Sequence, residues 1–85
     1  MYDYPLDPDW STEEIIDVIG LYNAVEKAYE EGISSKEFME HYHDFTSIAD
    51  SKALQKQLYK AFEEASGYSI YKVFKCAKEE EWVKL

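Results

Sequence analysis

The sequence predicts an all-α fold: a compact four-helix bundle or array, preceded by an extended, proline-containing N-terminal arm. Three observations support this prediction. Apolar residues recur at helical spacing in four segments, serines and glycines mark the ends of those segments, and no stretch alternates as a β-strand would. The 85 residues suffice for one domain, and an apolar content of 46% favours folding despite a formal net charge of −9.

The arm, residues 1–10, contains both prolines of the chain, Pro5 and Pro8. Proline fixes φ and biases the preceding residue toward extended geometry, so no helix is expected here. The arm is nevertheless too apolar for a free tail, and we expect it to lie across the helices. Its large apolar residues are Tyr2, Tyr4, Leu6 and Trp10.

The first helix is predicted over about residues 12–31. Ser11 and Glu14 match a capping box, in which each side chain accepts a hydrogen bond from the backbone N–H of the other residue. Gly32 then supplies the left-handed residue that ends many helices. At about 100° per residue, one face of this helix collects Ile15, Val18, Ile19, Tyr22, Val25 and Tyr29.

The same start and stop signals predict three further helices, at about residues 35–49, 52–66 and 70–80. Ser34 and Glu37 match a second capping box at the first of these. The other boundary residues are Asp50 or Ser51, Gly67 and Ser69. The residues predicted to face inward are Phe38, Tyr42, Phe45, Ile48 and Ala49; Leu54, Leu58, Ala61, Phe62 and Ala65; and Ile70, Val73, Phe74 and Ala77.

The tail, residues 81–85, is expected to fray. Glu79, Glu80 and Glu81 lie at the C-terminal end of the fourth helix, where carboxylates oppose the helix dipole. Trp82 directly follows these three acids, so it is the aromatic residue with the weakest claim to a place in the core.

Four short segments have an order and spacing typical of a known family: residues 4–6 (YPL), 9–14 (DWSTEE), 25–32 (VEKAYEEG) and 66–69 (SGYS). They resemble the YktA-like family of small uncharacterised proteins from low-GC Gram-positive bacteria. The resemblance runs from Tyr4 to about Lys78 and does not include the tail. It implies an all-helical, cytoplasmic bacterial protein. Since the family carries no assigned activity, substrate, cofactor or catalytic residue, the resemblance implies nothing about function.

Several classes of protein are excluded by composition. The chain has no apolar run near the roughly 20 residues that a membrane-spanning helix needs, and its acidic start does not match a signal peptide. A single cysteine, Cys76, fits a reducing cytoplasm and excludes a cysteine-type zinc site; we expect it to pack beside the inward face of its helix rather than to act as a reactive thiolate. The negative charge disfavours direct contact with nucleic acid.

No catalytic motif is present. The sequence has no Ser/His/Asp ordering and no glycine-rich phosphate loop, and without arginine it has no bidentate clamp for phosphate or carboxylate. We therefore expect a protein that is not an enzyme and uses no cofactor.

Glu26 lies within the apolar face of the first helix, between Tyr22 and Tyr29. A carboxylate that is buried without a partner costs several kcal/mol, so this position has two interpretations. Either Glu26 is a functional acid that transfers a proton or holds a partner's cation, or it accepts a hydrogen bond from a tyrosine hydroxyl, an amide or a lysine and fixes helix packing. The second is favoured, because no companion histidine, lysine or nucleophile accompanies the carboxylate.

His41 lies in a row with Glu37 and Asp44 on the second helix, a set of donor types that a divalent metal accepts. The favoured interpretation is a hydrogen-bonded histidine at the edge of the core, because Glu37 is needed for the capping box and no dense His/Cys cluster is present. His43 points to another face and is expected to be exposed.

Charge is distributed unevenly along the chain. Residues 1–31 carry nine acids and one lysine, whereas residues 52–85 carry seven lysines and five acids, with Lys52, Lys56 and Lys60 in one helical row. Two interpretations stay open: the two halves offset each other within the molecule, or the acidic arm and first helix attract a basic partner. In either case some negative surface must face the solvent.

Aromatic residues, at 16% of the chain, exceed what a core of this size can enclose, and tyrosine and tryptophan are favoured at interfaces. Trp10 and Trp82 have the least obvious cover; the alternative is that the arm simply seals the core.

The leading hypothesis is a non-enzymatic, cytoplasmic interaction module that binds a protein partner, a basic one by charge, through an acidic surface rich in tyrosine and tryptophan. The alternatives are a homodimeric structural or regulatory subunit and, ranked lower because the basic third helix interrupts the acidic surface, a nucleic-acid mimic.

Overall fold

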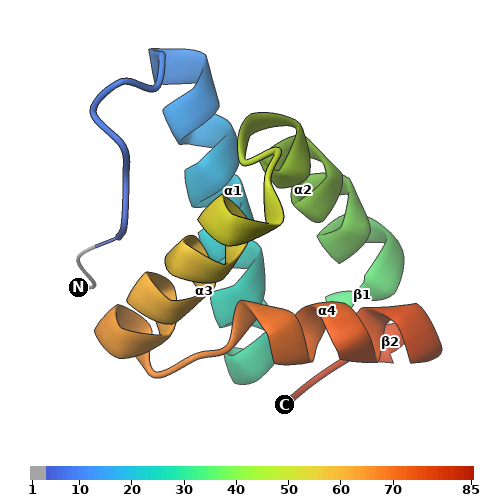
Figure 1. Ribbon diagram of the computed structural model, residues 1–85. Helices are drawn as coiled ribbons and strands as arrows, with labels where there is room; N and C mark the ends of the chain where they lie inside the picture. Colours follow the sequence, from blue (N-terminus) through green and yellow to red (C-terminus); the bar gives the residue numbers. More distant parts are fainter. Residues whose placement is uncertain (1–3) are drawn as a thin grey trace.

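The computed structural model describes residues 4–85, and it contains four helices and one short pair of strands (Figure 1). In chain order the elements are α1 (Thr12–Glu30), β1 (Ile33–Ser34), α2 (Ser35–Ile48), α3 (Lys52–Ser66), α4 (Ile70–Glu79) and β2 (Trp82–Val83). The predicted helical fold class is confirmed, and each helix ends within one residue of its predicted bounds. None of the helices in the described part of the chain has the length and apolar character to cross a membrane.

A serine side chain begins every helix. It accepts a hydrogen bond from the N–H three residues later, which satisfies one of the free amides of the first turn. The four pairs are Ser11 with Glu14, Ser34 with Glu37, Ser51 with Leu54, and Ser69 with Lys72. At α1 the capping box is complete, because the Glu14 carboxylate accepts from the Ser11 N–H at 2.8 Å.

Two glycines end helices as predicted. Gly32 and Gly67 have φ angles of +100° and +80°, in the left-handed region that residues with a Cβ rarely adopt. The Gly67 N–H donates to the carbonyl of Glu63 at 2.8 Å, and the Gly32 N–H donates to the carbonyl of Lys27 at 2.7 Å. Both turns therefore have a chemical cause that is visible in the sequence.

The core lies where α2 and α4 pack against α1, with α3 contacting α4 (Figure 1). Aromatic and aliphatic side chains from all four helices and both strands fill it. Its largest fully buried members are Tyr22, Phe38, Phe45, Phe62, Leu21, Ile33, Ile70, Val18, Val25, Val73 and Val83. On α1, Leu21, Ala24 and Ala28 are buried in addition to Val18, Tyr22 and Val25 of the predicted face, because neighbours cover this helix on more than one side.

The arm lies along the helices, as expected. The Tyr4 ring packs against the rings of Tyr22 and Phe62, with centroid distances of 5.2 and 6.1 Å. The Tyr22 hydroxyl donates to the carbonyl of Pro5 at 2.8 Å, which ties the arm to α1. Trp10 is half-buried and packs on the core. Tyr2, also predicted for this contact, lies outside the described residues.

Two predictions from the sequence are wrong: that the tail frays, and that the chain contains no strand. Ile33 pairs with Val83 and Ser34 with Trp82 in an antiparallel register, and the Leu85 N–H donates to the carbonyl of Ala28 at 3.0 Å. Val83 is completely buried. Burying this side chain and pairing the backbone outweigh the dipole effect of the nearby acids, which is worth only about 0.3–1 kcal/mol.

Candidate functional site

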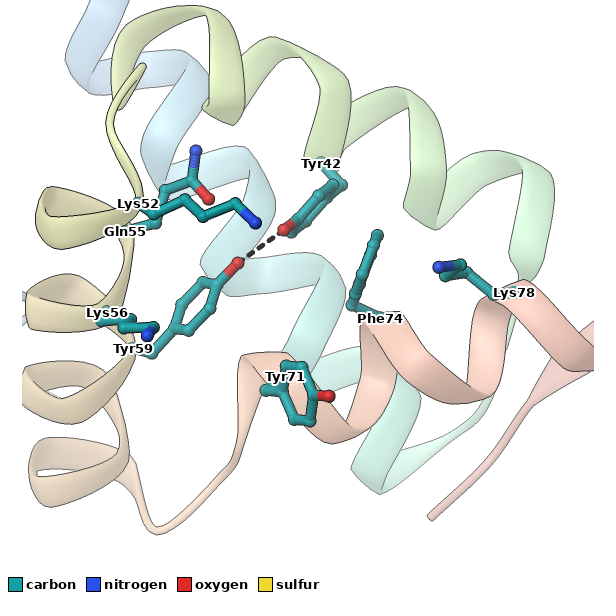
Figure 2. A pocket seen from close by; sticks show the side chains of 8 residues that line it. All are labelled: Tyr42, Lys52, Gln55, Lys56, Tyr59, Tyr71, Phe74 and Lys78. Atoms are coloured by element: carbon teal, nitrogen blue, oxygen red, sulfur yellow. Dashed lines mark hydrogen bonds between the residues drawn. The ribbon is translucent and has the colours of Figure 1, made fainter.

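A groove with a volume of about 540 Å³ lies between α2, α3 and α4 (Figure 2). Its lining combines aromatic rings with lysines and one amide, and we call it the tyrosine–lysine groove. The lining residues are Tyr42, Lys52, Gln55, Lys56, Tyr59, Tyr71, Phe74 and Lys78. None of these side chains comes from α1, which carries much of the negative charge of the chain.

Ring contacts fix the floor of the groove. The hydroxyl oxygens of Tyr42 and Tyr59 are 2.5 Å apart and join α2 to α3, and the Tyr42 ring stacks on Phe74 at a centroid distance of 4.3 Å. Tyr59 also lies near Phe45 of the core, with ring centroids 6.3 Å apart. Burial, together with the hydrogen bond to Tyr42, raises the pKa of Tyr59 above its usual value. The Tyr59 phenol is thus even harder to ionise than an ordinary tyrosine, which is already neutral at physiological pH, and it contributes a ring without charge to the floor.

Lysines stand on two sides of this floor. Lys52 and Lys56 project from α3, one helical turn apart, and Lys78 projects from α4 beyond Phe74 (Figure 2). The Lys78 ammonium lies 5.3 Å from the centroid of the Phe74 ring, a cation–π distance. Within residues 4–85 the only ion pair joins Lys27 to Glu37, so the lysines of the groove have no carboxylate partner there.

Tyr71 completes the groove on the solvent side. Its side chain is 54% exposed, although in the sequence it lies between the buried Ile70 and Val73 of the same helix. A large ring left half in water at the edge of a concave aromatic surface is a typical contact residue of a binding site.

Glu26 and Tyr22, two of the candidate residues, have partners within the molecule and do not line the groove. Glu26 is half-buried, and its carboxylate accepts a hydrogen bond from the Tyr4 hydroxyl at 2.8 Å. This is the tyrosine contact of the structural interpretation. Tyr22 is fully buried and stacks on Phe62 at 4.6 Å, and burial raises its pKa above the usual value. Tyr22 therefore has no surface to offer a partner.

Tyr29 is a bridge between α1 and the loop that precedes α4. Its ring stacks on Tyr68 with centroids 4.3 Å apart, and its hydroxyl accepts from the Ser69 N–H at 3.1 Å. The Tyr68 hydroxyl in turn donates to Glu30 at 2.9 Å. These contacts occupy Tyr29 within the fold, and the half-buried Trp10 is likewise packed on the core.

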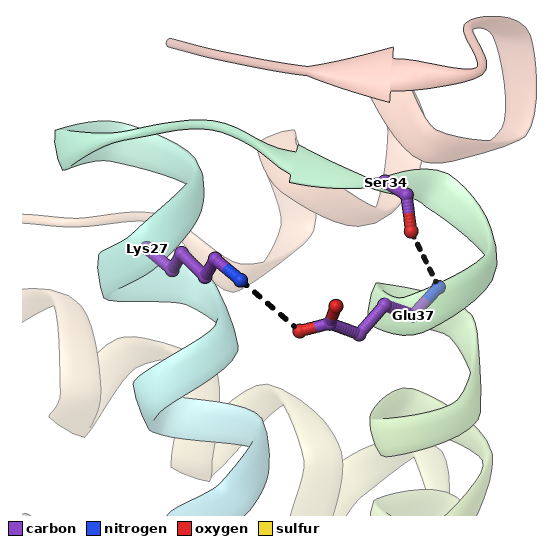
Figure 3. Close-up of polar contacts among 3 residues, drawn as sticks. All are labelled: Lys27, Ser34 and Glu37. Atoms are coloured by element: carbon purple, nitrogen blue, oxygen red, sulfur yellow. Dashed lines mark hydrogen bonds and ion pairs between the residues drawn. The ribbon is translucent and has the colours of Figure 1, made fainter.

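Glu37, His41 and Asp44, the row of possible metal ligands on α2, lie in three different environments. Glu37 contacts Lys27 at 3.5 Å, which leaves the second capping box half-formed: its N–H donates to Ser34, but its carboxylate turns to α1 (Figure 3). Asp44 lines a shallow surface depression with His43. Within the described part of the chain, no three metal-ligating side chains come together.

His41 is half-buried, as predicted for the core edge, and no other residue within 4–85 forms a hydrogen bond with its ring. Its ring lies against Gly20 of α1, so close that a Cβ atom at Gly20 would be 3.1 Å from Nδ1. The small residue on α1 allows the ring to pack against the helix backbone.

Trp82 is 59% exposed, although its indole lies close against Gly32. It is the candidate residue with the most accessible ring, and the exposed acids Glu79, Glu80 and Glu81 precede it. Cys76 is a free, half-buried thiol packed against the core, as expected from its place on α4.

The sequence does contain a signal for the groove, although the apolar faces and acidic segments do not reveal it. On α3 the lysine row continues into Gln55 and Tyr59, and on α4 Tyr71, Phe74 and Lys78 share one face at spacings of three and four residues. Each row mixes cations with rings, which a simple apolar face does not do. Only the packing of α3 beside α4 makes the two rows line the same groove.

Comparison with known proteins agrees with the resemblance carried by the sequence motifs. The model of the uncharacterised protein family UPF0223 matches residues 1–85, including the tail. A UPF0223 protein of Staphylococcus haemolyticus is 51% identical over 72 residues, which cover 85% of this chain and 80% of the relative. One from Bacillus cytotoxicus is 48% identical over 84 residues, covering 99% and 94% of the two chains, and one from Streptococcus thermophilus is 49% identical over 80 residues, covering 94% and 86%. The chain therefore belongs to the UPF0223 family of uncharacterised proteins, the YktA-like family.

Proposed function

We propose that this chain is a non-enzymatic, cytoplasmic protein-interaction module and that the tyrosine–lysine groove is its binding site. The observation that carries the proposal is the groove itself: a concave, aromatic surface of about 540 Å³ on a domain of only 85 residues. Exposed or half-exposed aromatic rings in a preformed hollow are the anchors on which protein interfaces depend.

The chemistry of the lining supports binding rather than catalysis. Phenols, a phenyl ring, an amide and ammonium groups line the groove, and no carboxylate, imidazole or thiol is among them. A tyrosine is protonated near neutral pH, and the raised pKa of Tyr59 makes its phenol harder still to deprotonate, so it is a poor base or nucleophile there. The candidate acid Glu26 lies outside the groove, with its carboxylate held by Tyr4.

Photo-crosslinking from inside the groove tests the proposal. A benzophenone amino acid replaces Tyr71, which is 54% exposed in the groove, or Ile16, which is 62% exposed on α1 and does not line it. Both proteins are expressed in a low-GC Gram-positive host and irradiated in the cell. We expect a discrete protein adduct from position 71 and none from position 16. No adduct from position 71, or identical adducts from both positions, contradicts the proposal.

A basic partner that docks on the acidic surface is the second candidate function. Its support is the 59% exposed indole of Trp82 beside three exposed glutamates, and the exposed Ile16 on the acidic helix α1. The same crosslinker at position 82 distinguishes the two surfaces. An adduct from position 82 or 16 alone favours the acidic surface, and an adduct of twice the monomer mass from any position favours a homodimer.

A further inference from the structure

We infer that the occupant of the tyrosine–lysine groove is an acidic segment of another protein, with an apolar or aromatic side chain between its carboxylates. This inference rests on the proposed function and adds the chemistry of the partner. An acidic occupant carries the opposite charge to the basic partner that the acidic first helix would attract.

The charges of the groove point to an anionic occupant. Lys52, Lys56 and Lys78 border the rings, no carboxylate lines the groove, and none of these ammonium groups forms an ion pair within residues 4–85. The chain has twice as many acids as lysines, so the gathering of three lysines around one hollow runs against the overall composition. Complementary charge is what selects partners and fixes their register at interfaces.

The arrangement of those charges indicates a pattern in the occupant. The two lysines of α3 lie on one side of the rings and Lys78 lies on the other, with Phe74 between them (Figure 2). An apolar side chain that rests on Tyr42 and Phe74 would place its flanking carboxylates within reach of both sides. The occupant is therefore a segment with acids on either side of one anchoring residue.

The negative net charge of −9 does not prevent such a contact. At physiological ionic strength charges are largely screened beyond about 8 Å, and α1 contributes no side chain to the groove. A short acidic peptide would contact only the lysine side of the molecule. A nucleic acid would extend its phosphates beyond the groove onto acidic surface, and no arginine is available to clamp them.

A defined peptide tests this inference. The probe is a fluorescein-labelled octapeptide, Glu-Asp-Glu-Trp-Leu-Glu-Asp-Glu, with a matched peptide in which every acid is replaced by its amide and a second in which Trp-Leu is replaced by Ala-Ala. Binding is measured by fluorescence anisotropy and mapped by amide chemical shifts of the isotope-labelled protein. We expect the acidic peptide to bind at least tenfold more tightly than either control and to shift the amides of Tyr71 and Phe74.

A charge-reversal pair assigns the binding to the groove. The double variant Lys52→Glu/Lys56→Glu is compared with Lys60→Glu/Lys72→Glu, which changes the net charge equally but alters two exposed lysines outside the groove. Each pair places one glutamate in the first turn of a helix, where it favours helix formation, so both variants are expected to keep their helical circular dichroism. We expect at least a tenfold loss of affinity for the groove pair and less than a twofold change for the control pair.

Four results would overturn the inference: no binding of the acidic peptide at millimolar concentration, equal binding of the amide peptide, equal loss in both double variants, or tighter binding of a labelled oligo(dT) at the same amides. Self-association would overturn it as well, if light scattering shows a dimer that the groove pair abolishes. A protein adduct from position 71 together with a charge-insensitive peptide result would leave the proposed function standing and reject only the acidic occupant.

Discussion

The indole of Trp82 covers Gly32 so closely that a Cβ atom added to the glycine would lie 2.6 Å from Nε1. The two residues are 50 positions apart in the sequence, and the strand pair of Ile33 with Val83 brings them together. Gly32 thus meets two separate demands: its φ of +100° ends α1, and its missing side chain makes room for the tail. This contact adds to the strand pair and to the burial of Val83, which hold the tail against the rest of the domain.

Replacing Gly32 by alanine is expected to lower the free energy of unfolding by about 1–2 kcal/mol from backbone strain alone, and further because the indole must move. Urea denaturation measures the loss. Gly67→Ala is the control, since its φ of +80° is also left-handed but no atom lies within 4 Å of the added Cβ. In a Trp82→Ala background the cost of Gly32→Ala should fall. If it does not fall, contact with the ring places no constraint on Gly32.

Shortening the buried tail residue should destabilise the whole domain. Val83→Ala removes two methyl groups from a completely buried position, which corresponds to a loss of about 1–3 kcal/mol. Thermal unfolding followed by circular dichroism measures it. The exposed neighbour Lys84→Ala is the control and should leave the stability within about 0.5 kcal/mol. Equal effects of the two substitutions would mean that the tail is not packed on the core.

The hydrogen bond between Tyr4 and Glu26 should contribute to the free energy of unfolding and should not affect binding in the groove. Tyr4→Phe removes the hydroxyl that donates to Glu26, and Glu26→Ala removes the acceptor, so a double-mutant cycle of the two should give a coupling energy of about 0.5–1.5 kcal/mol. The peptide affinity of the groove should not change in either variant. A changed affinity would restore the functional interpretation of Glu26. The exposed Glu13→Gln serves as a control for the loss of one negative charge.

Glu37 makes two polar contacts, one with Ser34 and one with Lys27, and the two should contribute unequally to the free energy of unfolding. Ser34→Ala removes the acceptor for the Glu37 N–H and should cost about 1 kcal/mol. Lys27→Ala removes an exposed ion pair with an N–O distance of 3.5 Å and should cost less than about 0.5 kcal/mol. Urea denaturation at low and high salt compares them. A larger or strongly salt-dependent loss for Lys27→Ala would show that the ion pair stabilises α1 against α2.

Stability should fall as the pH rises above about 10. Burial raises the pKa of Tyr22 and Tyr59 in the folded state, so above pH 10 the unfolded chain releases these protons and the folded chain keeps them. Above pH 10 the free energy of unfolding should fall by up to about 1.4 kcal/mol per pH unit because of the fully buried Tyr22, and by less because of the partly exposed Tyr59. Neither tyrosine should make it depend on pH between 7 and 9. Tyr22→Phe and Tyr59→Phe should each flatten the alkaline slope in urea denaturation. An unchanged slope in both variants would contradict the assigned burial.

Much of the fold could be predicted because its signals are local. Ser11, Ser34, Ser51 and Ser69 begin helices by bonding to amides three residues away, and Gly32 and Gly67 end them through their own φ. The strand pair could not be predicted, since each strand has two residues, too few to show alternation, and its partner lies about 50 positions away. The contact of the His41 ring with Gly20 could not be predicted for a related reason, because the two residues lie on different helices.

The candidate site depends on contacts between helices and was therefore harder to predict. The mixed rows of lysines and rings on α3 and α4 are visible in the sequence, but nothing local shows that the two rows lie side by side. By itself, the sequence determined the helices, their caps and the uneven charge, because hydrogen bonds within one helical turn and apolar periodicity depend on near neighbours. The tertiary structure alone decided that the cationic and aromatic faces of α3 and α4 border one hollow and that the tail packs on the core, because side chains far apart in the chain meet only when the helices pack.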